Sequence, residues 1–253
     1  MPDALLTTLL LLVGGFFAGV LNAIAGGGSL VTLPLLIFVG LPGTVANATN
    51  RIALFIGGIG ATQSFAKRGL IPPAWFKLAL PPALTGVVLG TWGATRVGDV
   101  AFERILAVVL LLAAGLILWH PIRPVEGADV PEPPAGAKRL WLLATFFCLG
   151  VYSGFIQAGV GFLFVALFAS QGIDLIRANG IKAPLILLFT GLAVVLFSFT
   201  GLLNWAAGLS LAGGQFFGAK FGVRLQVLKG QKWVRTVLIM AIIAFSIRLL
   251  LRG

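Results

Sequence analysis

The sequence predicts an all-α membrane protein made of two inverted repeats, each with about five helical elements. Of its 253 residues, 59% are hydrophobic and 10% are charged, and the mean hydropathy is +1.07. This balance is typical of a polytopic helical membrane protein and not of a soluble domain. The apolar residues form runs separated by short polar breaks, and glycine and basic positions of the first half recur in the second.

Ten apolar runs divide the chain. Those of the first repeat, 1–120, lie at roughly 4–24, 30–40, 48–66, 73–95 and 101–120. A segment rich in proline and charge, 121–139, follows and is expected to be a cytoplasmic linker. Those of the second repeat, 140–253, lie at roughly 140–158, 161–171, 178–199, 202–222 and 233–251. The second run of each half is only about half the length that crosses a bilayer, so the first pair in each half is expected to be broken or re-entrant.

The two halves match at nearly constant spacings. The spacing is 135 residues from Gly19, Asn22 and Gly26 to Gly154, Gln157 and Gly161; 131 from Arg51 to Lys182; and 128 from Gly86, Gly90 and Arg96 to Gly214, Gly218 and Arg224. Insertions in loops produce such a drift. The ordered series therefore predicts an internal duplication.

The distribution of basic residues predicts the orientation of the repeats. With five elements per half and loops assigned alternately to two sides, 13 of the 18 Lys and Arg residues fall on one side and 5 on the other, against 10 and 8 with four elements. The positive-inside rule prefers the first arrangement. An odd number of elements makes the repeats inverted and places both termini outside the inner membrane of the cell and the linker inside. A re-entrant hairpin and two full crossings give the same sidedness, so both remain open.

The stretch 19–51 holds the candidate site. An apolar helical run passes Asn22, breaks at Gly26–Gly28 and restarts at Ser29, which is a good N-cap residue. Backbone groups freed by a break inside apolar sequence are tolerated only where protein or a water-filled cavity satisfies them. A helix N-terminus also favours an anion. This stretch therefore predicts a polar, anion-binding pocket at membrane depth.

Basic and amide residues open the next apolar run of each half. Asn47, Asn50 and Arg51 do so in the first half, and an ionisable residue at such a place is a functional candidate by default. A guanidinium can hold an oxyanion through two hydrogen bonds. The alternative is that Arg51 lies at the membrane interface or holds neighbouring carbonyls. Lys182 occupies the matching place in the second half, where an interfacial position is equally natural.

The remaining candidates also have two interpretations. Asn22 and Gln157 either donate to ligand oxygens or tie helices together. The consecutive glycines either bring bare backbone close to a ligand or allow helices to pack closely.

The segment AGGGSLVTLPLL at 25–36, followed by TVANATNR at 44–51, resembles the TauE/SafE family of sulfite and organosulfonate exporters. The resemblance covers essentially the whole chain and implies a multipass carrier of small anions, commonly sulfite, sulfonates or related organic acids, without fixing the substrate. The motif positions that it carries over are Asn22, Gly26, Gly27, Gly28, Ser29, Thr32, Asn47, Asn50 and Arg51. With Gln157, Gly161 and Lys182 they form the predicted substrate-binding set. The second copy is looser, because Phe164 corresponds to Ser29 and Gly159-Val160-Gly161 to the three glycines.

Acidic and nucleophilic residues are scarce in the apolar runs. The seven acids fall in loops or at run ends: Asp3, Asp99, Glu103, Glu126, Asp129, Glu132 and Asp174. No carboxylate is left in an apolar core to bind a cation. With one cysteine, Cys148, one histidine, His120, and no P-loop, we expect no metal, no cofactor and no enzymatic activity.

The sequence thus predicts a secondary transporter that moves a small anion, a sulfite or sulfonate, by alternating access. An anion channel, a carrier of a non-sulfur organic acid and a membrane scaffold without transport are the alternatives. The expected partners are the small anion and the lipid bilayer. The net charge of +11 is explained by the positive-inside rule and does not indicate nucleic acid. Assembly into a homo-oligomer is left open.

Overall fold

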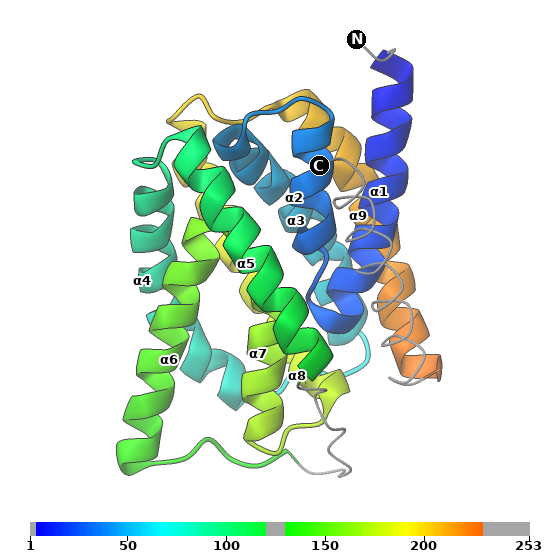
Figure 1. Cartoon of the computed structure of the whole chain (residues 1–253). Helices are drawn as coiled ribbons and strands as arrows, with labels where there is room; N and C mark the ends of the chain where they lie inside the picture. Colours follow the sequence, from blue (N-terminus) through cyan, green and yellow to red (C-terminus); the bar gives the residue numbers. More distant parts are fainter. Residues whose placement is uncertain (1–3, 120–129, 230–253) are drawn as a thin grey trace.

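The structure is a computed structural model that describes residues 4–119 and 130–229. Every regular element in these ranges is an α-helix (Figure 1): α1 (Ala4–Ala25), α2 (Ser29–Phe38), α3 (Gly43–Ala66), α4 (Pro73–Ala94), α5 (Asp99–Trp119), α6 (Gly136–Phe155), α7 (Val160–Ser170), α8 (Leu175–Ser198) and α9 (Trp205–Lys229). The all-α prediction is confirmed, and each helix coincides with a predicted apolar run to within a few residues. The last predicted run, 233–251, lies outside the described residues.

The first two helices of each half form a hairpin. With 10 residues, α2 is about 15 Å long, roughly half the thickness of a bilayer core. In Figure 1, α1 descends from the upper end and α2 returns toward that end, whereas α6 rises from the lower end and α7, of 11 residues, returns to it. Of the two arrangements that the charge count left open, the re-entrant hairpin is the one observed.

Hydrogen bonds join the chain segments at the upper end. The backbone N–H and the hydroxyl of Thr44, near the start of α3, both donate to the carboxylate of Asp99 at the start of α5, at 2.9 and 2.6 Å. The backbone N–H of Asn204, just before α9, donates to the hydroxyl of Thr49 at 3.0 Å. The helices α3, α5 and α9 therefore all begin at this end.

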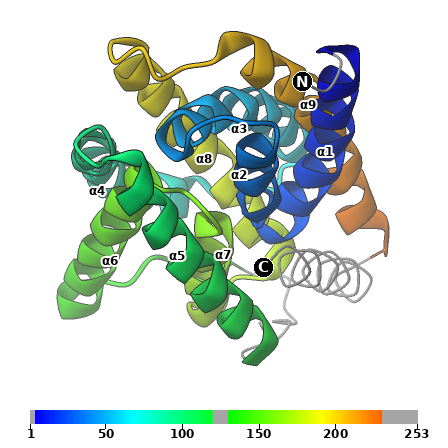
Figure 2. The same ribbon diagram turned by 45° about the horizontal axis from the view of Figure 1, so that its top comes forward.

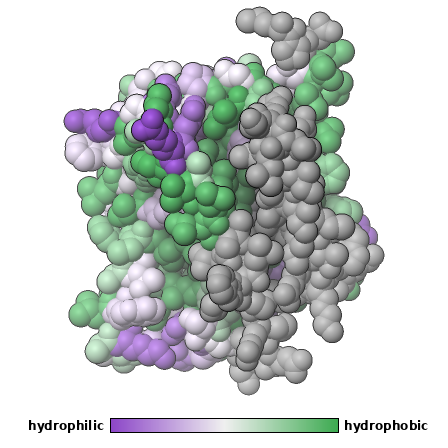
Figure 3. All heavy atoms as spheres, in the orientation of Figure 1, coloured by the Kyte–Doolittle hydropathy of each residue, from purple (hydrophilic) through white to green (hydrophobic). Residues whose placement is uncertain are grey.

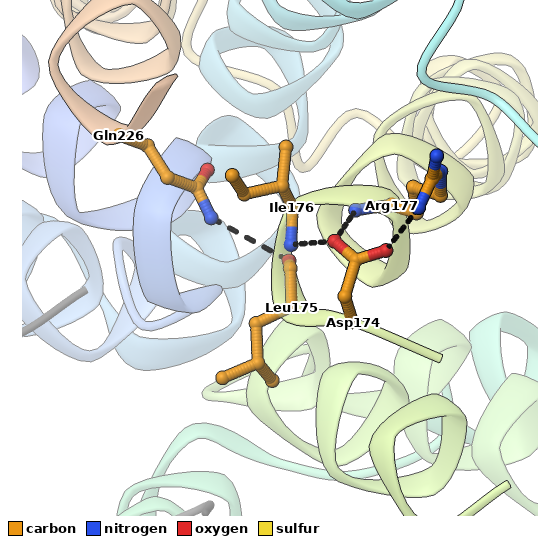
Figure 4. A network of polar contacts seen from close by, with 5 residues as sticks. All are labelled: Asp174, Leu175, Ile176, Arg177 and Gln226. Carbon is orange, nitrogen blue, oxygen red and sulfur yellow. Dashed lines mark hydrogen bonds and ion pairs between the residues drawn. The ribbon is translucent and has the colours of Figure 1, made fainter. Parts of the chain in front are cut away.

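The lower end is held by a polar network around the start of α8 (Figure 4). Asp174 is the N-cap of α8: its carboxylate accepts from the backbone N–H groups of Ile176 and Arg177 and pairs with the guanidinium of Arg177 at 3.0 Å. The side-chain amide of Gln226 near the end of α9 donates to the carbonyl of Leu175 at 3.5 Å. The network thus connects the start of α8 to the end of α9.

In the bundle, α3 and α8 lie between two outer helix pairs (Figure 2). In one pair, α1 packs against α9 through glycine. A Cβ atom added to Gly214 of α9 would lie 1.9 Å from the carbonyl oxygen of Leu12 in α1, and one on Gly218 would lie 2.0 Å from that of Phe16. Only a residue without a side chain permits this separation, as is common for glycine in membrane helices.

The other pair, α4 and α6, repeats the same contact. A Cβ added to Gly86 would lie 2.2 Å from the carbonyl oxygen of Phe147, and one on Gly90 would lie 2.0 Å from that of Val151. These glycines precede those of α9 by 128 residues, and their carbonyl partners follow those of α1 by 135, which are the spacings seen in the sequence. The repeated contact supports an internal duplication.

The surface of the bundle suits a bilayer. The face in Figure 3 is largely apolar across its middle, with hydrophilic residues gathered toward its upper and lower ends. Large hydrophobic side chains are exposed on several helices, among them Leu5 and Phe17 of α1, Leu111 of α5, Trp141 of α6 and Phe217 of α9. Among the described helices, α1, α4 and α8 are long and apolar enough to cross a membrane by length and composition.

The glycine contacts give the first testable prediction. Gly90→Ala and Gly218→Ala should each destabilise the protein by about 1–3 kcal/mol or more, because the added methyl group meets a backbone carbonyl that cannot rotate away. Gly98→Ala is the matched control, since a Cβ there meets no atom within 4 Å. Thermal unfolding in detergent measures the effect. Equal melting temperatures for all three variants would show that the two crossings are not tightly packed.

A second prediction concerns sidedness. Arg51 and Lys182 are buried, so they do not belong in the count of loop charges, and removing one from each side leaves 12 basic residues against 4. We expect the lower end to face the cytoplasm. In a Cys148→Ser background, Gly98→Cys at the upper end should react with a membrane-impermeant maleimide in intact cells. Arg68→Cys at the lower end should react only after permeabilisation. The reverse pattern would invert the proposed orientation.

Candidate functional site

The two helix breaks meet at the centre of the bundle. A Cβ added to Gly26, whose φ is +76°, would lie 2.2 Å from the carbonyl carbon of Gly161, and one on Gly161 would lie 2.6 Å from the Cα of Gly26. Close packing is therefore what these two glycines make possible. Gly28 packs in the same way, because a Cβ there would lie 2.4 Å from the carbonyl oxygen of Ala18. Gly27 lies buried between them.

The expected N-cap role of Ser29 is wrong. Gly28 is the N-cap of α2, it makes no side-chain cap, and Ser29 is already helical. The Ser29 hydroxyl instead donates to the carbonyl of Gln157 at 3.0 Å and accepts from the backbone N–H of Gly159 at 3.2 Å. Ser29 thus ties the α1–α2 break to the α6–α7 break, because that break offers it an unpaired carbonyl and N–H at close range.

The N-terminal turn of α2 is closed by local bonds. The backbone N–H of Leu30 donates to the carbonyl of Gly27, and those of Val31 and Thr32 donate to Gly28, each at 3.1 Å. These three N–H groups are occupied in this conformation. The anion-binding capacity of the centre therefore has to come mainly from side chains.

Arg51 caps the end of α6. It is 0% exposed, which differs from the interfacial position considered above. Its Nη1 donates to the carbonyl of Ser153 at 2.5 Å and to the side-chain oxygen of Gln157, and its Nη2 donates to the carbonyl of Gly154 at 2.9 Å and to the side-chain oxygen of Asn47 at 3.3 Å. The two carbonyls belong to the last turn of α6, where the helix dipole is negative and backbone acceptors lack partners within the helix.

The flanking residues complete this cap. The side-chain amide of Asn47 donates to the carbonyl of Phe155, the last residue of α6, at 2.9 Å. The ring of Phe197 in α8 lies 5.9 Å from the Arg51 guanidinium carbon. Two α3 side chains one turn apart therefore satisfy the end of α6, and an aromatic ring closes one side.

Lys182 caps the end of α1 in the corresponding way. Its Nζ donates to the carbonyl of Asn22 at 2.6 Å and to the side-chain oxygen of Asn179 at 2.5 Å. The side-chain amide of Asn179 donates to the carbonyl of Ile24 at 2.9 Å. The basic residue of each half thus holds the end of the first helix of the other half.

Hydrogen-bond donors without partners gather beside Arg51. The buried atoms without a partner there are Arg51 Nε, Asn50 Nδ2, Gln157 Nε2 and Ser153 Oγ. The first three are N–H groups, which can only donate. Gln157 Oε1 accepts from Arg51 and Asn50 Oδ1 accepts from the Thr32 hydroxyl at 2.7 Å, so the amide nitrogens are the free ends. Each unpaired buried donor costs about 1–3 kcal/mol.

The backbone at Gln157 is unusual as well. Its φ is +56°, and it is the one non-glycine residue with positive φ in the described part of the chain. Such a conformation costs on the order of 1–3 kcal/mol and is concentrated at functional sites. Strain and unpaired donors therefore coincide at the α6–α7 break.

The centre is closed in this conformation. A cavity beside Lys182, bordered by Asn22, Phe65, Ala183 and Ala219, has a volume of about 10 Å³, which is room for one water molecule. An oxyanion of several heavy atoms does not fit there. Residues at the centre have to move apart to admit one.

Comparison with known proteins identifies the family. The family model described as "Sulfite exporter TauE/SafE" matches residues 11–249. The chain belongs to this family. It is therefore a membrane transporter, and the resemblance seen in the sequence is confirmed.

Relatives agree with this assignment. The "Probable membrane transporter protein ORF9" of Sinorhizobium sp. is 33% identical over 244 residues, which cover 95% of this chain and 91% of the relative. The "Probable membrane transporter protein YfcA" of Escherichia coli K12 is 30% identical over 235 residues, 92% of this chain and 86% of the relative. A "Probable membrane transporter protein" of Haemophilus influenzae is 29% identical over 229 residues, 89% and 87% of the two chains. No solved structure matches the chain.

The structure of this TauE/SafE chain brings most of the predicted residues together at the two breaks. Ser29, Thr32, Asn47, Asn50, Arg51 and Gln157 form one connected group at the α6–α7 break. Asn22 and Lys182 lie at the α1–α2 break. Sequence reasoning missed Asn179. Its position three residues before Lys182, as Asn47 stands four before Arg51, puts each amide on the helix face of its basic residue and could have indicated it.

The Ser29 bridge can be tested directly. Ser29→Ala removes two hydrogen bonds and leaves the Gln157 carbonyl and the Gly159 N–H unpaired, so it should destabilise the protein by about 1–3 kcal/mol. Ser170→Ala is the control, because the Ser170 hydroxyl is exposed and bonds only within its own helix. Thermal unfolding of both purified variants is the measurement. If Ser29→Ala melts like the control, the two breaks are not held together by this hydroxyl.

Proposed function

We propose that this TauE/SafE chain is a secondary transporter that moves a small oxyanion, a sulfite or sulfonate, across the inner membrane by alternating access. The observation that carries the proposal is the group of three unpaired, buried N–H donors around Arg51, Asn50 and Gln157. Arg51 adds a full positive charge with no carboxylate among its hydrogen-bond partners. An oxyanion supplies both the acceptors and the negative charge that this group lacks.

The donor geometry supports a ligand with several oxygens. The Nε and one Nη of a guanidinium can bind two oxygens of one anion, and charge-assisted bonds of this kind are stronger than neutral ones. The Asn50 and Gln157 amides offer further donors on adjacent elements, α3 and the α6–α7 break. A sulfonate with three equivalent oxygens uses such a set better than a carboxylate with two. A non-sulfur organic acid is thus the second candidate substrate.

The alternating-access part of the proposal rests on inverted repeats. The hairpins α1–α2 and α6–α7 enter from opposite ends, meet at Gly26 and Gly161, and are each capped by the other half. Carriers with inverted repeats bind substrate near the midplane at such discontinuous helices and rock one repeat against the other. An anion channel would need no such exchange, so saturable flux with counterflow in proteoliposomes separates a carrier from a channel.

The family name supports the same substrate class. The family is described as a sulfite exporter family, and the relatives are described as probable membrane transporters. Neither name gives the cargo of this chain. Direction and substrate therefore follow only from measurement.

Variants of Arg51 test the proposal. Arg51→Lys keeps the charge but loses the planar fork, so it should weaken binding of a sulfonate and retain part of it. Arg51→Gln removes the charge and should lower affinity roughly tenfold to a hundredfold, since a hydrogen bond to a charged group contributes about 1.5–3 kcal/mol. Binding of methanesulfonate and sulfite to purified protein is measured by calorimetry.

Only folded, monodisperse protein enters this comparison, because each variant also alters the cap on α6. Arg104→Gln is the control, since Arg104 is exposed on α5 and should leave affinity unchanged. Equal affinities for Arg, Lys and Gln at position 51 would exclude the guanidinium from the binding site.

A further inference from the structure

We propose that Lys182 is a proton-binding site coupled to the anion, so that an anion bound at Arg51 is accompanied by a proton bound at Lys182. The inference rests on the proposed anion site and assigns a second ligand, the proton, to the other helix break. It is carried by the hydrogen bonds of Lys182, by its uncharged surroundings and by its contact with the break that holds Arg51.

The hydrogen bonds of Lys182 suit both protonation states. Its Nζ has two acceptors, the Asn22 carbonyl and the Asn179 side-chain oxygen. An ammonium carries three N–H groups and a neutral amine carries two. Release of one proton therefore leaves both bonds intact. Arg51 cannot act in this way, because a guanidinium stays protonated in proteins.

The surroundings of Lys182 contain no counter-charge. The described residues that face it from the packed elements are uncharged and do not titrate: Asn22 of α1, Phe65 of α3, Gly161 of α7, Ala219 of α9 and Ala183 of its own helix. Lys220, next along α9, is exposed and lies over the ring of Phe216 at 4.1 Å. Since no carboxylate holds the ammonium, the transported anion is the negative charge available to stabilise it.

A cavity gives the proton a place to enter and leave. The water-sized cavity beside Lys182 is bordered by Asn22 and Lys182 itself, with apolar residues around the rest. A water molecule there can take the third proton from Nζ or deliver it. The exchange needs no other reactant: the proton comes from water on one side of the membrane and returns to water on the other.

The two charges lie on one connected structure. A Cβ added to Gly161 would lie 3.1 Å from the Cδ of Lys182, and Gln157, four residues earlier in the same break, accepts from Arg51. Two positive charges in a medium of low dielectric repel each other, and an anion at Arg51 offsets that repulsion. Anion binding should therefore favour protonated Lys182, and protonated Lys182 should raise anion affinity by the same factor. For a monovalent anion, transport is then electroneutral.

The test is anion binding to the purified full chain across pH 6 to 9. Methanesulfonate is the probe because its own charge does not change in this range. Calorimetry in buffers of different ionisation enthalpy reports the protons taken up per anion. Wild-type protein should take up as much as one proton, with affinity falling about tenfold as the pH rises. Lys182→Met should bind with no proton uptake and no pH dependence, and Lys220→Met should behave like wild type.

Two further variants separate proton binding from a structural cap. Lys182→Arg keeps a fixed charge, and Asn179→Asp supplies a carboxylate that holds Lys182 protonated. Both should bind methanesulfonate without proton uptake. Wild-type binding with no proton uptake would overturn this inference and leave the proposed anion site standing. Failure of folded wild-type protein to bind methanesulfonate, isethionate or sulfite at any pH would overturn the anion site and this inference with it.

Discussion

The structure depends on how the backbone is satisfied where two helices stop inside a bilayer-sized bundle. The last carbonyls of α1 and α6 have no partner within their helices, and hydrocarbon offers none. Arg51 donates to the end of α6 and Lys182 to the end of α1, each supported by an asparagine on its own helix. Because α3 and α8 supply these caps, each half completes the hairpin of the other, and neither hairpin could be stable at this depth alone.

This solution buries two cations without a carboxylate between them. Carbonyl dipoles and amide oxygens offset part of each charge, but Arg51 Nε and the amides of Asn50 and Gln157 stay unpaired. A protein evolved only for stability would fill these valences. The unmet donors and the left-handed backbone of Gln157 mark the α6–α7 break as the more polar and more strained of the two. The same arrangement that completes the fold therefore leaves an incomplete coordination shell for an anion.

The glycines serve the same end from outside the centre. Gly86 and Gly90 on α4, and Gly214 and Gly218 on α9, bring the outer helix pairs to backbone contact. Such contacts keep α1 and α6 straight against their partners up to the point where they break. The offset between halves changes at that point: the left-handed residue after the first helix is Gly26 in one half and Gln157 in the other, which are 131 residues apart and not 135. Gly26 and Gly161, matched by the sequence spacing, are in fact contact partners.

The sequence alone determined that the chain is an all-helical membrane protein of the TauE/SafE family, where nearly every described helix lies, and which polar residues stand near the breaks. These features depend on hydrophobic runs, glycine spacing and a local motif, all of which are properties of neighbouring residues. Tertiary structure decided the rest: that α1–α2 is a hairpin, that Ser29 bridges to Gly159 instead of capping α2, and that Arg51 and Lys182 cap the opposite halves. Those outcomes join residues more than 100 positions apart, and a hydroxyl or a guanidinium bonds whichever unpaired group the fold brings near it, which no local pattern encodes.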